Sequence, residues 1–211
     1  MKENTYKVLM INGSPHVHGT TYAALEEVKC ALESEGIECE IVHVGKERVG
    51  GCAACYACSK LKRCAFDDMV NVLAQKLYEA DGLVIGSPVH YASPAGGLSA
   101  ILDRLFYSSR FDKSMKVGAS VVAARRGGCT ATFDALNKYF TISGMPLVSS
   151  SYWNQIHGGS YDEAQEDAEG KQTMRMLGKN MAFLIKSIAL GKESLGLPER
   201  ERKIYTNFIK Q

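Results

Sequence analysis

Short apolar runs alternate along the chain with longer segments in which apolar residues recur every three or four positions. The apolar runs are bounded by turn residues and predict five buried strands, at 7–13, 40–44, 82–89, 117–124 and 147–153. The periodic segments predict helices at 20–36, 67–80, 94–107, 130–143 and 162–190. Strands that alternate with helices in this way indicate a parallel sheet with both faces covered.

Particular residues suggest where the helices begin and break. Asp67 or Asp68 is expected to cap the second helix, and Pro94 to lie in the first turn of the third. The long final helix is expected to be interrupted at Gly170 or Gly178. Residues 45–66, which separate the second strand from the second helix, are predicted to form a loop.

Together these elements predict an α/β, flavodoxin-like three-layer sandwich. The expected sheet has five parallel strands in the order 2-1-3-4-5, and its ligand site lies at the carboxyl ends of strands one, three and four. One domain is predicted over residues 1–190. Residues 191–211, which are polar and charged, are interpreted as a tail or a partner-docking segment.

Composition and charge narrow the class of protein. The chain of 211 residues is 45% apolar and 23% charged, which is ordinary for a globular domain. A net charge of +2 with dispersed Lys and Arg gives no reason to expect a nucleic-acid partner. No apolar run reaches the roughly 20 residues that span a membrane, and the start lacks the apolar stretch of a signal peptide. We therefore expect a cytoplasmic protein, in which seven cysteines indicate metal or redox chemistry rather than a disulfide framework, with Cys30 and Cys39 packing as small apolar residues.

The segment between the first strand and the first helix has the character of an anion-binding loop. Small or hydroxyl-bearing residues and two histidines follow one another, at Gly13, Ser14, His16, His18, Gly19, Thr20 and Thr21. A helix N-terminus adds positive potential and free N–H groups. The loop has neither a Walker nor a G-x-G-x-x-G pattern. A terminal monophosphate is the ligand it suits, and a plain turn with a capping threonine is the alternative.

The loop Gly13-Ser-Pro-His-x-x-Gly-Thr-Thr21 resembles the phosphate loop of the NAD(P)H-dependent FMN reductase family. The resemblance extends over nearly the whole chain and implies a flavodoxin-like fold that grips the FMN phosphate with this loop. His16 stands where the family usually has Arg, and Thr20 where it usually has Asn. The change at His16 removes a guanidinium that a neutral imidazole cannot replace.

Two later loops are expected to meet the flavin ring. In the segment after the third strand, the resemblance implies that Pro88, Val89, His90 and Tyr91 run beside the ring, although His90 departs from the usual aromatic; local packing of Tyr91 is the alternative. After the fourth strand, Gly127 and Gly128 permit close approach of the backbone. Arg125 or Arg126 is predicted to place positive charge near the flavin or the nicotinamide cofactor, unless both are simply exposed. Cys129 is interpreted as structural.

Four cysteines with the spacing C-x2-C-x2-C-x5-C lie within the predicted loop, at Cys52, Cys55, Cys58 and Cys64. This run resembles the compact motif of the iron–sulfur flavoproteins, in which four thiolates hold a [4Fe–4S] cluster. A zinc ion, thiol redox chemistry and a metal-free structural loop remain as alternatives.

We predict an FMN-dependent NAD(P)H oxidoreductase in which flavin N5 carries the chemistry and no side chain acts as acid or base. Electrons would pass to a small acceptor such as a quinone, a flavin, or a nitro or azo compound. One alternative is an electron carrier that uses the cluster and a ferredoxin-like partner, and another is a non-enzymatic flavin sensor. The resemblance implies a homodimer or homotetramer. Asp103 and Arg104 are interpreted as surface pairing or helix packing, and His43 as a packing residue of the core or the sheet edge. Trp153 and His157 are interpreted as packing residues, with an approach to the flavin of a neighbouring subunit as the alternative.

Overall fold

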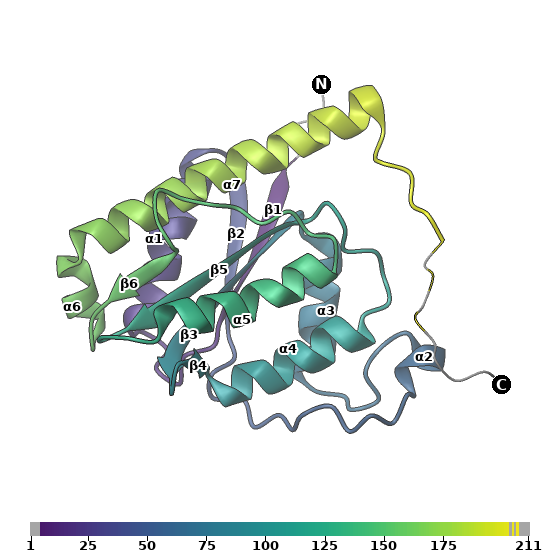
Figure 1. The fold of residues 1–211 in the computed structure, drawn as a ribbon, viewed down its shortest axis with the longest axis horizontal. Coiled ribbons are helices and arrows are strands. Elements are labelled where there is room, and N and C mark those ends of the chain that lie inside the picture. The colour runs from purple at the N-terminus through teal and green to yellow at the C-terminus, as the bar shows by residue number, and fades with distance from the viewer. Residues whose placement is uncertain (1–4, 203, 205, 207–211) are drawn as a thin grey trace.

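A sheet of parallel strands forms the centre of the molecule in the computed structural model, which describes residues 5–202, 204 and 206 (Figure 1). Its main path runs β2-β1-β3-β5-β6. The strands of this path are β1 (Tyr6–Asn12), β2 (Ile37–His43), β3 (Gly82–His90), β5 (Val117–Ala124) and β6 (Gln155–His157). Counted along the chain, this is the predicted order 2-1-3-4-5. A two-residue strand, β4 (Ser93–Pro94), pairs antiparallel with the end of β3, so the sheet has six strands instead of five.

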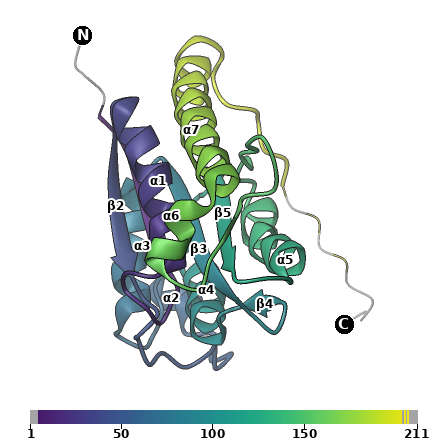
Figure 2. The same cartoon turned by 90° about the vertical axis from the view of Figure 1, so that its left-hand side faces the viewer.

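Helices cover both faces of the sheet (Figure 2). One face carries α1 (Thr20–Ser34), α6 (Tyr161–Glu166) and α7 (Ala168–Leu195). The other carries α3 (Met69–Glu79), α4 (Gly96–Ser108) and α5 (Cys129–Ile142). A further short helix, α2 (Cys58–Leu61), lies in the loop between β2 and α3, where the sequence predicted no helix. The flavodoxin-like α/β class is confirmed.

The two-residue repeat of the strands explains why the apolar runs are almost continuous. On β1, Val8 and Met10 pack toward α1 and α7, whereas Leu9 and Ile11 pack toward α3 and α4. Because successive side chains point to opposite faces and both faces are covered, the central positions of such a strand are mostly apolar. All eight residues of β5 are buried for this reason.

The fifth strand was predicted in the wrong place. Leu147 forms only an isolated bridge with Gly118, and regular pairing with β5 begins at Gln155. The chain joins the sheet at Asn154. Its side-chain N–H donates to the Ser120 carbonyl (3.1 Å), and its backbone carbonyl accepts from Val122 N (2.9 Å). The apolar run before it passes along the sheet edge, where Trp153 remains exposed.

Three helix boundaries also differ from expectation. Pro94 lies in β4, and α4 begins at Gly96. The final helix breaks at Asp167, whose carboxylate caps α7 by accepting from Gly170 N (2.9 Å). The helix α7 continues to Leu195, so the first residues of the predicted tail are helical. Residues 203, 205 and 207–211 of that tail lie outside the described residues. The cap at Asp68 is confirmed, since its side chain accepts from Val70 N.

Among the described helices, none combines the length and the apolar character that crossing a bilayer requires.

Candidate functional site

A cavity of about 370 Å³ opens at the carboxyl edge of the sheet. It is lined from the turns that follow β1, β3, β5 and β6, by Ser14, His16, His18, Gly19, Thr20, Thr21, Pro88, Val89, His90, Ala123, Ala124, Arg125, Gly158, Gly159, Ser160 and Tyr161. Ligands of open parallel sheets bind at this edge, beside the point where the strand order reverses. A larger cavity lies at the opposite edge, near Tyr6 and Val117, where that rule gives no reason to expect a site.

The loop after β1 is held in shape by its own polar groups. The Asn12 side chain accepts from Ser14 N and donates to the Val17 carbonyl, both at 3.1 Å. The Ser14 hydroxyl accepts from His16 N, also at 3.1 Å. Hydrogen bonds from side chains to the backbone hold this turn in place of backbone–backbone hydrogen bonds. The loop therefore has its shape without a bound ligand.

The segment after β2 braces the same loop from outside. His43 Nε2 lies 2.8 Å from the Ser14 carbonyl oxygen. Gly45 lies so close that a Cβ atom built on it would be 1.8 Å from that same oxygen. Only a residue without a side chain fits there, because the neighbouring atoms belong to the backbone. His43 is therefore a packing residue, as predicted, and it also contacts the candidate phosphate loop directly.

Two adjacent threonines at the start of α1 behave differently. The Thr20 hydroxyl donates to the carbonyls of Gly158 (3.0 Å) and Ser160 (3.1 Å). The Thr21 hydroxyl is buried in the cavity lining and has no hydrogen-bond partner among the described residues. A buried hydroxyl without a partner costs about 1–3 kcal/mol. Thr21 is therefore the threonine whose hydroxyl remains free for a bound group.

The first turn of α1 adds backbone donors. The first intrahelical bond runs from Ala23 N to the Gly19 carbonyl, so the three preceding N–H groups have no acceptor within the helix. Gly19 caps the helix without a side-chain hydrogen bond, which leaves this end open. Such an end favours an anion.

The turns after β3 and β5 contribute only part of the predicted set. Pro88, Val89 and His90 line the cavity, and so does Arg125. Tyr91 is fully exposed with a positive φ of 50° and does not line it, and neither do Arg126, Gly127 or Gly128. Gly128 (φ 95°) serves packing, since a Cβ there would lie 2.8 Å from Val89 Cγ1. Cys129 is buried, as its structural interpretation requires.

The turn between β6 and α6 was missed by sequence reasoning. Its residues Gly158, Gly159, Ser160 and Tyr161 close one side of the cavity. Tyr161 donates to Glu26 (2.6 Å), and this hydrogen bond, with burial, raises the pKa of Tyr161 to about 12. The Gly-Gly-Ser sequence was a usable signal, but the strand before it had been predicted too early in the chain.

Comparison with known families decides the assignment. Residues 6–158 match the NADPH-dependent FMN reductase family, a span that includes the loops after β1, β3 and β5. The chain belongs to this family.

Within the FMN reductase family, the chain resembles the iron–sulfur flavoproteins. An iron–sulfur flavoprotein of Methanocaldococcus jannaschii is 33% identical over 194 residues, which is 86% of this chain and 98% of that protein. The crystal structure of RosB with bound 8-demethyl-8-formylriboflavin-5'-phosphate shares the fold, with a TM-score of 0.70 at 17% identity, covering 98% of this chain and 95% of RosB. A flavodoxin from the domain Archaea superimposes with a TM-score of 0.57 at 16% identity, covering 85% and 99%.

A second cavity is lined by the four closely spaced cysteines, Cys52, Cys55, Cys58 and Cys64. Cys58 on α2 and Cys64 are buried, whereas Cys52 and Cys55 are exposed. The remaining lining comes from residues beside the cysteines and from α4, and it consists of Ala53, Tyr56, Ala65, Phe66, Arg104, Tyr107 and Ser108. No described residue lines both this cavity and the cavity of about 370 Å³ at the carboxyl edge of the sheet, which we call the flavin-edge cavity.

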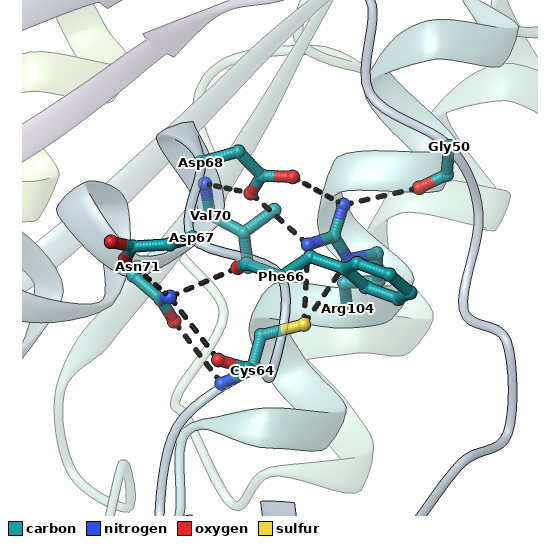
Figure 3. Close-up of polar contacts among 8 residues, drawn as sticks. All are labelled: Gly50, Cys64, Phe66, Asp67, Asp68, Val70, Asn71 and Arg104. Atoms are coloured by element: carbon teal, nitrogen blue, oxygen red, sulfur yellow. Dashed lines mark hydrogen bonds and ion pairs between the residues drawn. The ribbon is translucent and has the colours of Figure 1, made fainter. Parts of the chain in front are cut away.

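A buried arginine on α4 holds the cysteine segment in place (Figure 3). Arg104 is 3% exposed, and its guanidinium donates to Cys64 Sγ, to both oxygens of Asp68 and to the Gly50 carbonyl. Burial alone lowers the pKa of Arg104, but the hydrogen bonds with Asp68 and Cys64 raise it above its usual value. The neighbouring Asp103 does pair near the surface, with Tyr139 (2.5 Å).

Asn71 secures the other side of Cys64. Its side chain accepts from Cys64 N (3.1 Å) and donates to the carbonyls of Cys64 (3.2 Å) and Phe66 (3.0 Å). By contrast, no hydrogen bond within the described part of the chain holds residues 51–55. The cavity is thus rigid on the side of the buried cysteines and unrestrained on the side of the exposed pair.

The present arrangement is too compact for a single-ion site or a cluster. The described residues contain no group of three or more His, Cys, Asp or Glu side chains placed to hold one metal ion. The cavity volume is about 20 Å³, roughly the space of one water molecule. A cluster would therefore require residues 51–55 to move outward, and this movement breaks no hydrogen bond of the described chain.

Proposed function

We propose that the protein binds FMN in the flavin-edge cavity and passes electrons from NADH or NADPH to a small acceptor such as a quinone, a flavin, or a nitro or azo compound. The observation that carries this proposal is the buried, unpartnered hydroxyl of Thr21 at the open N-terminus of α1. A phosphate oxygen there would accept from this hydroxyl and from the first N–H groups of the helix. Membership of the FMN reductase family supports the same ligand.

The side chains around the cavity bind and orient, and none is assigned as an acid or base. When bound, FMN supplies hydride acceptance at its N5 atom and onward electron transfer. Pro88 and Val89 offer an apolar wall for a planar ring. Arg125 brings a positive charge to the same cavity, which favours an anionic reduced ring.

Turnover under controlled conditions tests this function and separates it from a flavin sensor. We expect the purified yellow protein to lose its flavin absorbance on anaerobic addition of NADH or NADPH, and to regain it repeatedly when a quinone is supplied. A protein that binds FMN but is not reduced by either nucleotide would exclude the oxidoreductase and leave the sensor.

We expect Thr21→Val to weaken FMN binding by about 1–3 kcal/mol, because the isosteric side chain removes one charge-assisted hydrogen bond. Thr20→Val is the matched control. Its hydroxyl already serves the β6–α6 turn, so the change is expected to cost about 1 kcal/mol of folding stability but less FMN affinity than Thr21→Val. Titrating the apoprotein with FMN and following flavin fluorescence measures both. Equal losses at the two positions would show that the phosphate lies elsewhere.

A second candidate function, that of a one-electron carrier, follows from the cysteine cavity. We propose that Cys52, Cys55, Cys58 and Cys64 hold a [4Fe–4S] cluster, which supplies single-electron transfer when present, with a ferredoxin-like protein as partner. The convergence of all four cysteines on one cavity favours it, as does the donation of Arg104 to Cys64 and of Arg110 to Cys58 Sγ (3.6 Å). In the described arrangement no three of these ligands surround one point, so a cluster and a single zinc ion would both require residues 51–55 to move.

Self-association into a homodimer or homotetramer is part of the proposal. Large apolar side chains remain exposed after β3, before β6 and on α7, among them Tyr91, Trp153 and Phe183. Covering them would remove apolar surface from water. Sedimentation of the FMN-loaded protein tests this, and a monomer at micromolar concentration would contradict it.

A further inference from the structure

The long helix α7 has apolar residues on two opposite faces, and the body of the protein covers one of them. The covered face packs on α1 and the sheet through Met174, Leu177, Met181, Ala182 and Ile185. The other face carries Met176, Phe183 and Leu190, which lie in line because residues seven apart return to nearly the same side of a helix. All three side chains are exposed, Phe183 by 74%. Figure 1 shows α7 along the outer edge of the molecule, with the sheet on one side of it.

This outer stripe of α7 is almost free of charge. Its positions are Gln172, Met176, Lys179, Phe183, Ser187, Leu190 and Ser194, and among them only Lys179 is charged. The face of a surface helix that remains in water is usually charged or polar, whereas an apolar stripe packs on another surface. Contiguous exposed apolar surface on a globular protein marks an interaction site. The stripe therefore has the character of a contact face.

Exposed apolar side chains of a second segment border the stripe. The chain before β6 runs beside α7, where Asn180 Nδ2 donates to the Ser149 carbonyl (2.8 Å). Leu147, Tyr152 and Trp153 of this segment are exposed, and the rings of Tyr152 and Trp153 lie 4.9 Å apart. Tyrosine and tryptophan are enriched among the residues that contribute most to protein–protein binding. We call the stripe and this segment together the α7 surface.

On the other flank of the stripe, charges are already paired within the chain. Arg175 contacts Glu27 (3.2 Å), and Lys186 contacts Glu35 (3.4 Å). Protein interfaces have an apolar centre and a polar rim. These pairs would form such a rim without bringing an uncompensated charge to the contact.

The order of residues in the stripe fits a second copy of the same chain. Counted from Phe183, the stripe positions lie four, seven and eleven residues away in both directions. In an antiparallel helix pair with a two-fold axis at Phe183, Met176 faces Leu190 of the second copy, and Lys179 faces Ser187 of the second copy. Apolar residues then meet apolar residues, and the single positive charge meets a hydroxyl instead of another positive charge.

We propose that two copies of this chain associate through the α7 surface, with their α7 helices antiparallel and Phe183 on the two-fold axis. The proposal rests on the self-association proposed above and names its contact face. A specific interface covers about 800 Å² on each partner. One helix stripe is smaller than this, so the contact includes Tyr152 and Trp153 beside it. Among the described residues, none that lines the flavin-edge cavity belongs to α7, so this contact leaves each cavity open.

Phe183→Glu tests the contact face, because it places two like charges on the two-fold axis. Sedimentation of the FMN-loaded protein over a range of concentrations gives the dissociation constant. We expect this constant to rise about 30-fold or more, the effect of losing one dominant interface residue. Tyr78→Glu is the matched control, since Tyr78 is also an exposed aromatic residue but lies on α3, and it is expected to leave the constant unchanged. Circular dichroism checks that both variants fold.

Charge exchange between positions 179 and 187 tests the register. Within one helix these residues are about 12 Å apart along the axis, too far to pair within the chain. We expect Ser187→Glu to lower the dissociation constant about threefold by pairing with Lys179 of the second copy, and Ser187→Lys to raise it about threefold. Lys179→Glu combined with Ser187→Lys is expected to restore association, which the separate effects of the two changes would not predict.

The outcomes separate this surface from the proposals on which it rests. A wild-type protein that binds FMN but stays monomeric overturns both self-association and the α7 surface. A dimer that is equally stable in wild type and in Phe183→Glu, or that shows no coupling between positions 179 and 187, overturns the α7 surface alone. A monomer that sediments with phosphatidylglycerol vesicles, and ceases to do so in Phe183→Glu, assigns the face to a lipid surface instead. Failure to bind FMN contradicts the proposed function, and association of the apoprotein then decides the α7 surface.

Discussion

Gly45→Ala is expected to abolish tight FMN binding. A Cβ atom at this position would lie 1.8 Å from the Ser14 carbonyl oxygen, 2.2 Å from its carbon and 2.8 Å from Pro15 N. These are backbone atoms that cannot rotate away, so the phosphate loop must be displaced as a whole. Overpacking of this kind costs about 3 kcal/mol or more, and an equal loss of binding energy lowers FMN affinity about 100-fold.

The control for this prediction lies in the same loop. A Cβ atom on Gly51 would meet nothing within 4 Å, so Gly51→Ala is expected to bind FMN like the wild type. Fluorescence titration with FMN and denaturant unfolding measure the two effects in both variants. Wild-type affinity in Gly45→Ala would mean that the loop after β1 does not hold the phosphate.

Cys64→Ser is expected to remove bound iron while leaving FMN binding intact. Cys64 is the buried cysteine that Arg104 and Asn71 hold in position, so the proposed cluster site would lose its most firmly placed ligand. Serine preserves an acceptor for Arg104 and limits the structural cost. FMN affinity should not change, because the two cavities share no described residue.

Cys30→Ser serves as the matched control for iron content. Cys30 is exposed on α1 and lies outside the cysteine cavity, so the variant is expected to retain as much iron as the wild type. Iron and acid-labile sulfide are measured per chain after anaerobic loading. Full wild-type iron content in Cys64→Ser would contradict the assignment of this residue as a ligand.

The sequence predicted best those strands whose side chains are buried on both faces of the sheet. The strand β5 was located to the residue, at Val117–Ala124, because every position faces a covered side of the sheet. The fifth strand was misplaced because the apolar run before Asn154 lies along an edge and is only partly buried. An apolar run alone does not distinguish these situations.

The site was predictable only as far as it is local in sequence. The loop from Ser14 to Thr21 was recognised as a unit. The different roles of Thr20 and Thr21 depend on the Gly158 carbonyl, 138 residues away. Arg104 lies 40 residues from the sulfur that it contacts. No sequence motif joins residues that far apart, because only the packing of α4 against the loop brings them together.

The four thiols differ in solvent exposure, and this difference sets the order in which they are expected to be oxidised. Dioxygen and chelators dissolved in the buffer reach Cys52 and Cys55 first, since these are exposed, and reach Cys58 and Cys64 last. Oxidation should therefore begin at the exposed cysteines and leave the thiols of Cys58 and Cys64, beside Arg110 and Arg104, intact. If the proposed cluster is present, its colour and iron content after purification in air would then depend on how long the sample was exposed to oxygen.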